Sequence, residues 1–275
     1  SSNNDLAYPK TLYTNPISGL TTYILKSSTN NDVVAWYESL QQLSYDYDKE
    51  NHWRYTNKLD RKYETLVVSY NGFIPEPDTF DHFTKMEGHK WQIIKKIPEI
   101  MDLSKYKYIA CVDDDLITDI QSFNEGLTYA EAFDFRLWQL SMLLGSGITY
   151  PCLVQNKECD FAETNFIEMG SPFFRYDIFL KLVDFLKELD FTVGWGIDKM
   201  FCDVLETTAH VVHSSSIYHP PNHIKPSYYD QGDAHREMGY NIDHVYPRIM
   251  RDKYNKPDWK FRDSQVTLNM YKLTR

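Results

Sequence analysis

The sequence has too few basic residues to form a surface that binds nucleic acid. It carries 29 Lys and Arg against 39 Asp and Glu, a net charge of −10, whereas a phosphate backbone requires a basic footprint. No apolar run approaches the roughly 20 residues of a membrane span. The opening, SSNNDLAYPK, lacks the basic and apolar regions of a signal peptide, and it begins with serine rather than methionine. We therefore expect no nucleic-acid partner and no membrane span, and the opening fits a chain from which a leader or anchor has been trimmed.

Cysteine is also scarce, with four residues in 275. Cys111, in an apolar strand pattern, and Cys202, in an apolar helical pattern, are predicted to be buried free thiols. Cys152 and Cys159 could bridge a loop, but the spacing fits neither a zinc site nor a disulfide framework. There is no Asn-x-Ser/Thr glycosylation acceptor. These absences favour a reducing, non-secretory compartment, and we expect a cytoplasmic protein.

Aromatic residues, by contrast, are abundant: they make up 15% of the chain and include 21 Tyr. This content supports either a thick core or a surface that stacks on flat apolar faces such as sugar rings. The sequence shows no repeat, no low-complexity tract and no obvious linker. It therefore predicts a single domain over 1–275, with a core at 20–221 and a C-terminal loop and extension at 222–275.

Strand and helix patterns alternate along this core. The predicted strands are 20–28, 64–72, 106–112 and 164–170, and the second of them is closed by an Asn-Gly turn. The predicted helices are 32–43 and the segment 88–101 up to an interruption at Pro98, and a glycine-flanked turn runs into a short helix at 194–206. A further strand is expected from Ala209, before a loop rich in proline and histidine. This alternation predicts an α/β fold with a mixed, mostly parallel sheet, whose ligand site lies at the carboxyl ends of the strands.

One boundary can be predicted to the residue, whereas two regions have no single assignment. We expect the strand at 164–170 to end at Gly170, with Ser171 and Pro172 as the cap and first residue of the next helix. The apolar positions of that helix keep the 3.6-residue period and predict its buried face: Ile178, Leu182, Phe185, Leu186 and Leu189. The segment 136–150 fits either a helix or a strand, and the residues beyond Lys225 fit no clear pattern.

Three consecutive aspartates, Asp113, Asp114 and Asp115, follow the apolar strand YKYIACV. Neighbouring carboxylates repel one another and raise each other's pKa, so a positive partner is needed. Two carboxylates separated by one residue are suited to Mg²⁺ or Mn²⁺, which are bound by carboxylates together with substrate phosphates. The triplet therefore predicts a metal site, and its alternative is a solvated turn.

The segment GWGID is the second candidate site. Gly194 and Gly196 allow the backbone to approach a ligand closely, and Trp195 between them offers a face for stacking. Asp198 would lie in the first turn of the following helix, where the helix dipole favours the ionised form. A charged carboxylate facing a cleft is suited to act as a general base on a hydroxyl. The alternative is that Asp198 caps the helix and Trp195 belongs to the core.

Three further side chains are candidates with structural alternatives. His219 follows an apolar strand and could complete the metal shell, favouring Mn²⁺, or it could be a hydrogen-bonded structural residue. Lys90 could contact a phosphate or be solvated on its helix. Glu168, expected at a strand end, is the second candidate base, and its alternative is an acceptor contact or a structural hydrogen bond. Weaker candidates on the same grounds as His219 are His210, His213 and His223.

The ordered blocks HKW, VDDDL, NFIEMGSPFFR, GWGID and SSSIYH resemble the glycosyltransferase-like domain family that is common in plants and known there as lysine-ketoglutarate-reductase trans-splicing related. Relatives of that family occur in bacteria and large viruses. The resemblance runs from Leu20 to Pro221, and it implies a nucleotide-sugar-binding fold of the GT-A type. GWGID is also similar to the Trp-Gly-x-x-Glu-Asp region of β-1,4-galactosyltransferases, in which an Asp is the catalytic base.

The resemblance assigns roles to the candidates. Asp113 and Asp115 would form the Asp-x-Asp motif, with Asp115 on the metal, Asp113 facing the ribose or the metal, and His219 as a late metal ligand. Asp198 would be the base. Two departures are present: a single Ile-Asp replaces the Glu-Asp pair, and His213 stands where plant relatives usually have an acid. The candidate donor-binding residues are Asp113, Asp114, Lys90 and Trp195.

These features predict a metal-dependent, inverting glycosyltransferase that uses Mn²⁺ or Mg²⁺. The donor would be a nucleotide sugar, with UDP-xylose or UDP-galactose as first guesses, and the acceptor a hydroxyl of a glycan or glycoprotein. One alternative is a sugar nucleotidyltransferase, against which the sequence lacks a Gly-rich phosphate loop after its first strand. The other is a glycan-binding module without catalytic activity, favoured by the aromatic content.

Overall fold

The computed structural model describes residues 61–69, 80–113, 116–147, 150–219, 231–261 and 264–273, and the backbone of two strands nearer the N-terminus. Those two strands, β1 (Ala7–Thr14) and β2 (Thr21–Lys26), pair antiparallel. The strand predicted at 20–28 is thus confirmed, but it is the second strand and not the first. Strands β3 (Leu66–Ser69) and β4 (His82–Lys85) form a parallel pair. The helix predicted at 32–43 and the turn after β3 lie outside the described residues.

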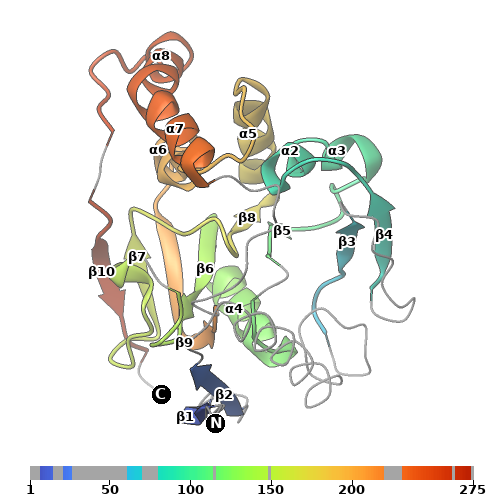
Figure 1. Cartoon of the computed structure of the whole chain (residues 1–275), viewed down its shortest axis with the longest axis vertical. Helices are drawn as coiled ribbons and strands as arrows, with labels where there is room; N and C mark the ends of the chain where they lie inside the picture. The colour runs from blue at the N-terminus through green and yellow to red at the C-terminus, as the bar shows by residue number, and fades with distance from the viewer. Residues whose placement is uncertain are drawn as a thin grey trace, which may run out of the picture.

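A six-stranded sheet forms the centre of the molecule, in the order β10-β7-β9-β6-β8-β5 (Figure 1). Its strands are β5 (Tyr108–Ala110), β6 (Leu137–Met142), β7 (Phe161–Thr164), β8 (Phe173–Arg175), β9 (Ala209–Ile217) and β10 (Thr267–Tyr271). Only the β6–β9 pair is parallel; the other four neighbouring pairs are antiparallel. The mixed α/β class is confirmed, but the prediction of a mostly parallel sheet was wrong.

Strand direction nevertheless brings three carboxyl ends to one edge of the sheet. Strands β5 and β6 are both antiparallel to β8, so they run in the same direction, and β9 is parallel to β6. The residues after β5 and β9 therefore leave the sheet at the same edge. Strand β8 begins at that edge, because Phe173 pairs with Ala110 at the end of β5. The residues just before Phe173 consequently lie beside those just after Ala110.

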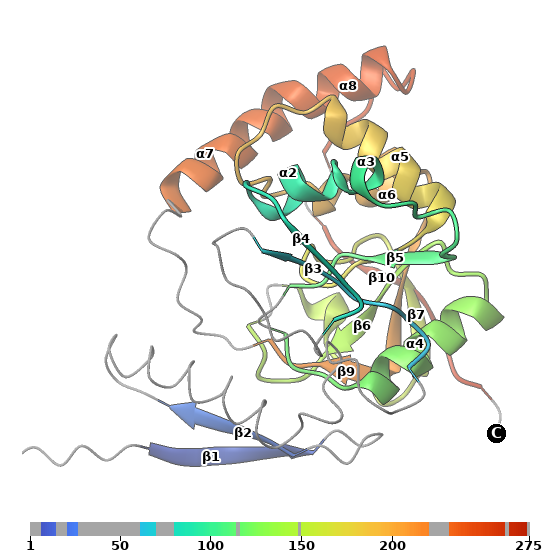
Figure 2. The ribbon, with the colours of Figure 1, turned by 90° about the vertical axis from the view of Figure 1, so that its right-hand side faces the viewer.

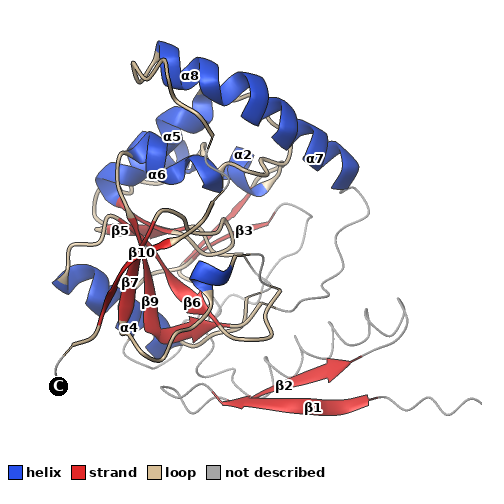
Figure 3. Cartoon of the chain, turned by 90° about the vertical axis from the view of Figure 1, so that its left-hand side faces the viewer, coloured by secondary structure: helices blue, strands red, loops and turns tan. Residues whose placement is uncertain are grey.

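Helices cover both faces of this sheet. Figure 3 shows α4 on one side of the strands and α2, α5, α6, α7 and α8 on the other. The described helices are α2 (Lys90–Ile94), α3 (Ile97–Ile100), α4 (Ile120–Ala132), α5 (Tyr176–Lys187), α6 (Phe201–Leu205), α7 (Gln231–Tyr240) and α8 (Tyr246–Asp252), with 3₁₀ turns η2 (Pro151–Leu153) and η3 (Asp198–Met200) and a π-helical turn η4 (Asn241–Val245). No helix in the described ranges combines the length and apolar character that a membrane crossing requires.

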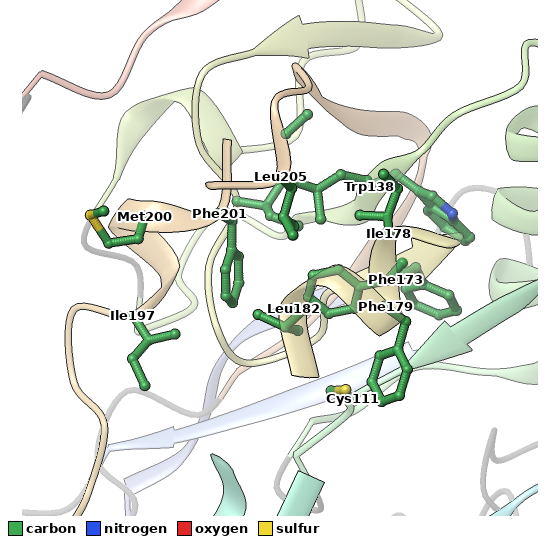
Figure 4. Close-up of a cluster of buried hydrophobic side chains, with 14 of the residues drawn as sticks. Cys111, Trp138, Phe173, Ile178, Phe179, Leu182, Ile197, Met200, Phe201 and Leu205 are labelled. Atoms are coloured by element: carbon green, nitrogen blue, oxygen red, sulfur yellow. The ribbon is translucent and has the colours of Figure 1, made fainter. Parts of the chain in front are cut away.

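The main core lies between α5, α6 and the sheet. The positions of α5 that keep the helical period in the sequence, such as Ile178, Leu182 and Phe185, are fully buried. Ile178 and Leu182 lie in one buried cluster with Phe201 of α6 and with Phe173 and Trp138 of the sheet (Figure 4). Because close-packed apolar side chains resist displacement, this core holds the 194–200 segment, through buried Ile197 and Met200, against the end of the sheet.

The local boundaries differ from the sequence prediction in several places. Strand β7 ends at Thr164, residues 165–172 form a connection, and Phe173–Arg175 is a strand, so Ser171 and Pro172 do not open a helix; α5 begins at Tyr176. The undecided segment 136–150 contains β6. The unassigned C-terminal region contains α7, α8 and an edge strand of the main sheet.

The cysteines also differ in part from the prediction. Cys111 is buried, as predicted, but Cys202 is only half-buried. Cys152 and Cys159 are both buried free thiols and do not bridge their loop.

Candidate functional site

The carboxyl end of β5 is held to the connection before β8 by a partly exposed ion pair between Lys90 and Asp113. The Lys90 ammonium donates to Asp113 Oδ1 at 2.6 Å, to the Met169 carbonyl at 2.5 Å and to the Gly170 carbonyl at 3.3 Å. The Asp113 N–H donates to the same Gly170 carbonyl at 2.8 Å. A lysine ammonium has three hydrogens, so these three acceptors satisfy Lys90. The sequence suggested a phosphate ligand at Lys90; in this structure the lysine compensates Asp113.

Gly170 lies next to the second oxygen of Asp113. A Cβ at this position would lie 3.7 Å from Asp113 Oδ2 and 4.0 Å from Leu116 Cδ1. Any larger side chain would fill the volume next to the carboxylate. Asp113 Oδ1 therefore accepts from Lys90, whereas Oδ2 lies next to a residue that has no side chain.

The end of β9 lies against the segment that follows the acidic triplet. Ile117 and Tyr218 exchange backbone hydrogen bonds of 2.9 Å in both directions. His219, the next residue, is half-buried, and its N–H donates to Ser146 Oγ at 3.2 Å. This pairing brings His219 to the same sheet edge as Asp113. Asp114 and Asp115 lie outside the described residues.

Glu168 is the half-buried carboxylate of this edge. Its N–H donates to Oε1 of the buried Gln139 on β6 at 2.7 Å, which holds residues 165–168 over the sheet. Burial raises the pKa of Glu168 to about 7; the negative charges of Asp198 and Asp113 also raise it, whereas His219 and Lys90 lower it. The same electrostatic couplings show that Glu168 lies among the other candidates. The sequence predicted that Glu168 lies at a strand end, but it belongs to the connection between β7 and β8.

Asp198 begins the 3₁₀ turn η3 and is 7% exposed. Its Oδ1 accepts a hydrogen bond from the Lys199 N–H at 2.9 Å. Burial raises the pKa of Asp198 to about 6, although hydrogen bonds from the backbone of Lys199 and Met169 lower it. Asp198 lies in the first turn leading into α6, as predicted, but the expectation that this position would favour the ionised form was wrong in direction, because desolvation outweighs the backbone donors.

The Gly194–Asp198 loop packs against α7, which the sequence did not predict. Gly194 and Gly196 have positive φ angles of 83° and 80°, a conformation that favours glycine. Trp195 is half-buried and meets the His235 ring edge-on, with centroids 4.8 Å apart. Trp195 therefore belongs neither to the core nor to a fully open face.

The weaker histidine candidates have structural surroundings. His213 is buried, its Nδ1 accepts the Asn156 N–H at 3.1 Å, and burial lowers its pKa to about 4. His210 stacks on Phe135 with centroids 4.1 Å apart. His223 lies outside the described residues.

The donor chemistry at this edge fits a divalent cation. Asp113 supplies a carboxylate at the end of β5, and His219 supplies an imidazole at the end of β9, with β8 and β6 between the two strands. Carboxylate oxygen with imidazole suits Mn²⁺ or Mg²⁺. Within the described ranges, which omit Asp114 and Asp115, no three His, Cys, Asp or Glu side chains are grouped to hold a metal.

Comparisons with known proteins add little. No protein-family model and no curated protein matches the chain. Among solved structures, the crystal structure of A197 from STIV aligns with 53% of this chain and 86% of its own chain, at 15% sequence identity and a TM-score of 0.33. This overlap carries no argument about the fold or the function.

Proposed function

We propose that the protein is a metal-dependent glycosyltransferase with a GT-A-type domain, which moves a sugar from a nucleotide diphosphate to an acceptor hydroxyl. One observation carries the proposal: two carboxylates with raised pKa values, Glu168 and Asp198, share a sheet edge with Asp113 and His219. Acids with displaced pKa values beside a candidate cation site are typical of catalytic centres. The resemblance of the ordered motifs supports the same class.

Donor binding would use the β5 edge. Asp113, Asp115 and His219 would hold Mn²⁺ or Mg²⁺, which, when bound, neutralises the negative charge on a departing diphosphate. Trp195 offers a half-exposed ring near this edge for stacking on the donor. UDP is the nucleotide that the family resemblance favours.

Asp198 is the first choice for the base. With a pKa of about 6 it is mostly ionised at neutral pH, whereas Glu168, with a pKa of about 7, is close to half protonated. An ionised carboxylate can accept the proton of an attacking hydroxyl. A single base behind the acceptor gives inversion at the anomeric carbon. Glu168 is the second choice, favoured by its greater exposure.

The test combines turnover with binding. We expect the chain with Mn²⁺ to release UDP from a UDP-sugar in the presence of glycan acceptors, and UDP to raise the melting temperature. Chelation by EDTA should remove most of that rise, because the diphosphate is held through the metal. Equal thermal shifts with and without EDTA would contradict a metal bridge. Formation of UDP-sugar from UTP and a sugar 1-phosphate, without transfer, would instead indicate a nucleotidyltransferase.

A further inference from the structure

Helix α7 holds the backbone that leads into the Gly194–Asp198 loop through one side chain, Glu237. Its Oε2 accepts the Thr192 N–H at 2.6 Å, and its Oε1 accepts the N–H groups of Val193 at 3.2 Å and Gly194 at 2.8 Å. Hydrogen bonds to an ionised carboxylate are roughly twice as strong as those between neutral groups. Three consecutive backbone amides are therefore fixed by a single carboxylate from another element.

The loop is fitted closely to the same helix. A Cβ on Gly196 would lie 2.8 Å from Met238 Cγ, so no larger residue can take this place without a shift. The Trp195 ring meets His235 of α7 edge-on. Glu237, Met238 and His235 thus contact successive parts of the loop from one helix.

The segment formed by α7, η4 and α8 also interacts electrostatically with Asp198, through Tyr246. Helices α7 and α8 run on from one another through η4 (Figure 2). Tyr246, the first residue of α8, is fully buried, and its pKa is raised by burial and by the negative charges of Asp198 and Glu237. Its hydroxyl has no hydrogen-bond partner in the described structure. This arrangement places Tyr246 within the electrostatic reach of both acids.

We infer that Glu237 is a positioning residue, which holds the 192–194 backbone and thereby sets the positions of Trp195 and Asp198. The inference rests on the proposed function for the role of Asp198. Glu237 acts through the loop, because its carboxylate is occupied by backbone donors. A displacement of about 1 Å at a reacting group can cost about a hundredfold in rate, so an anchor of this kind affects turnover more than substrate affinity.

The test compares Glu237→Ala and Glu237→Gln with Asp233→Asn, a matched control whose side chain on the same helix is 68% exposed. In Glu237→Ala, amide hydrogen exchange at 192–194 should accelerate by about tenfold or more. The kcat for transfer should fall by roughly tenfold to a hundredfold, and KM for the donor should rise by a smaller factor of about threefold to tenfold, because Trp195 is displaced together with Asp198. Glu237→Gln should recover part of both, since its carbonyl oxygen can still accept from Val193 and Gly194. The control should match the parent.

A second readout needs no substrate. The emission of Trp195, obtained as the difference between each variant and its Trp195→Phe counterpart, should shift to longer wavelength in Glu237→Ala as the ring leaves α7. Unchanged exchange and unchanged emission would overturn the inference, as would faster exchange with unaltered kcat. If no nucleotide sugar is turned over by the parent, the proposed function fails, and exchange and emission still decide whether Glu237 positions the loop.

Discussion

Asp113 and Asp198 are two acids at the same sheet edge, and they are held in opposite ways. Asp113 is about a third exposed and has the Lys90 ammonium 2.6 Å from its Oδ1. Asp198 is 7% exposed and accepts hydrogen bonds from backbone N–H groups, with burial raising its pKa to about 6. The first carboxylate has a strong cationic partner and partial hydration, and the second has lost most of its hydration.

The difference separates two chemical roles. A carboxylate that is paired with a cation keeps its charge and is suited to hold a positive ligand. A desolvated carboxylate, which gains stability when it binds a proton, is suited to accept one from a hydroxyl. The electrostatic setting therefore divides the proposed site into a donor side at Asp113 and an acceptor side at Asp198 and Glu168.

The largest expected effect is the loss of transfer on Asp198→Asn. The amide cannot accept the proton, so kcat should fall by roughly a hundredfold to ten-thousandfold, while UDP still raises the melting temperature as in the parent. The measurement is the rate of transfer with the identified donor, together with NMR of the product anomer, which should be inverted.

Glu168→Gln and the exposed Asp190→Asn are the matched comparisons for that variant. Asp190→Asn should keep the parental rate. If Glu168→Gln abolishes transfer while Asp198→Asn stays within a few-fold of the parent, the base is Glu168. A retained anomer would remove a single-base mechanism altogether.

The next effect concerns stability and pH. Glu168 has a pKa of about 7 in the folded chain against an ordinary value of 4.5, so between these values the folded state binds more protons than the unfolded state. This carboxyl therefore makes the free energy of unfolding fall as pH rises from about 4.5 to 7, with no further change above that range. Glu168→Gln removes this loss, and it should gain stability relative to the parent by roughly 1 to 3 kcal/mol across the window.

Urea unfolding at several pH values measures this difference. The control is Glu131→Gln, which changes the same side-chain type at an exposed position of α4. A difference between Glu168→Gln and the parent that does not vary with pH would show that the folded environment does not disfavour the charge on Glu168. The acceptor side of the site would then consist of Asp198 alone.

The sequence could predict the residue types of this site but not their partners. VDDDL indicates a strand end because adjacent carboxylates are unfavourable inside a buried strand, and GWGID indicates a loop because glycine adopts positive φ readily. The apolar period of α5 predicted its buried face. Sheet direction could not be predicted, since the three-residue strands β5 and β8 carry too little pattern to reveal an antiparallel pair. Glu237 could not be found either, because its acceptor role depends on backbone amides 43 to 45 residues away.

The smallest expected effect is on the Asp113 side. Lys90→Met removes the donor for Asp113 Oδ1 and for the carbonyls of Met169 and Gly170. Because the ion pair is partly exposed, we expect a loss of only about 1 to 2 kcal/mol in the free energy of unfolding. The control is Lys96→Met, the same substitution at a nearby exposed lysine. It should leave the free energy of unfolding within about 0.5 kcal/mol of the parent.

A double-mutant cycle with Asp113→Asn isolates the pair. If Lys90 mainly compensates Asp113, the double variant should be less destabilised than the sum of the single variants, with a coupling of about 0.5 to 1 kcal/mol. The affinity of the Lys90→Met variant for UDP with Mn²⁺ should then fall only indirectly, through the displacement of Asp113. A variant with parental stability and no coupling, but with UDP binding lost, would make Lys90 a phosphate ligand. In that case the contrast between Asp113 and Asp198 would have to be tested again with the donor bound.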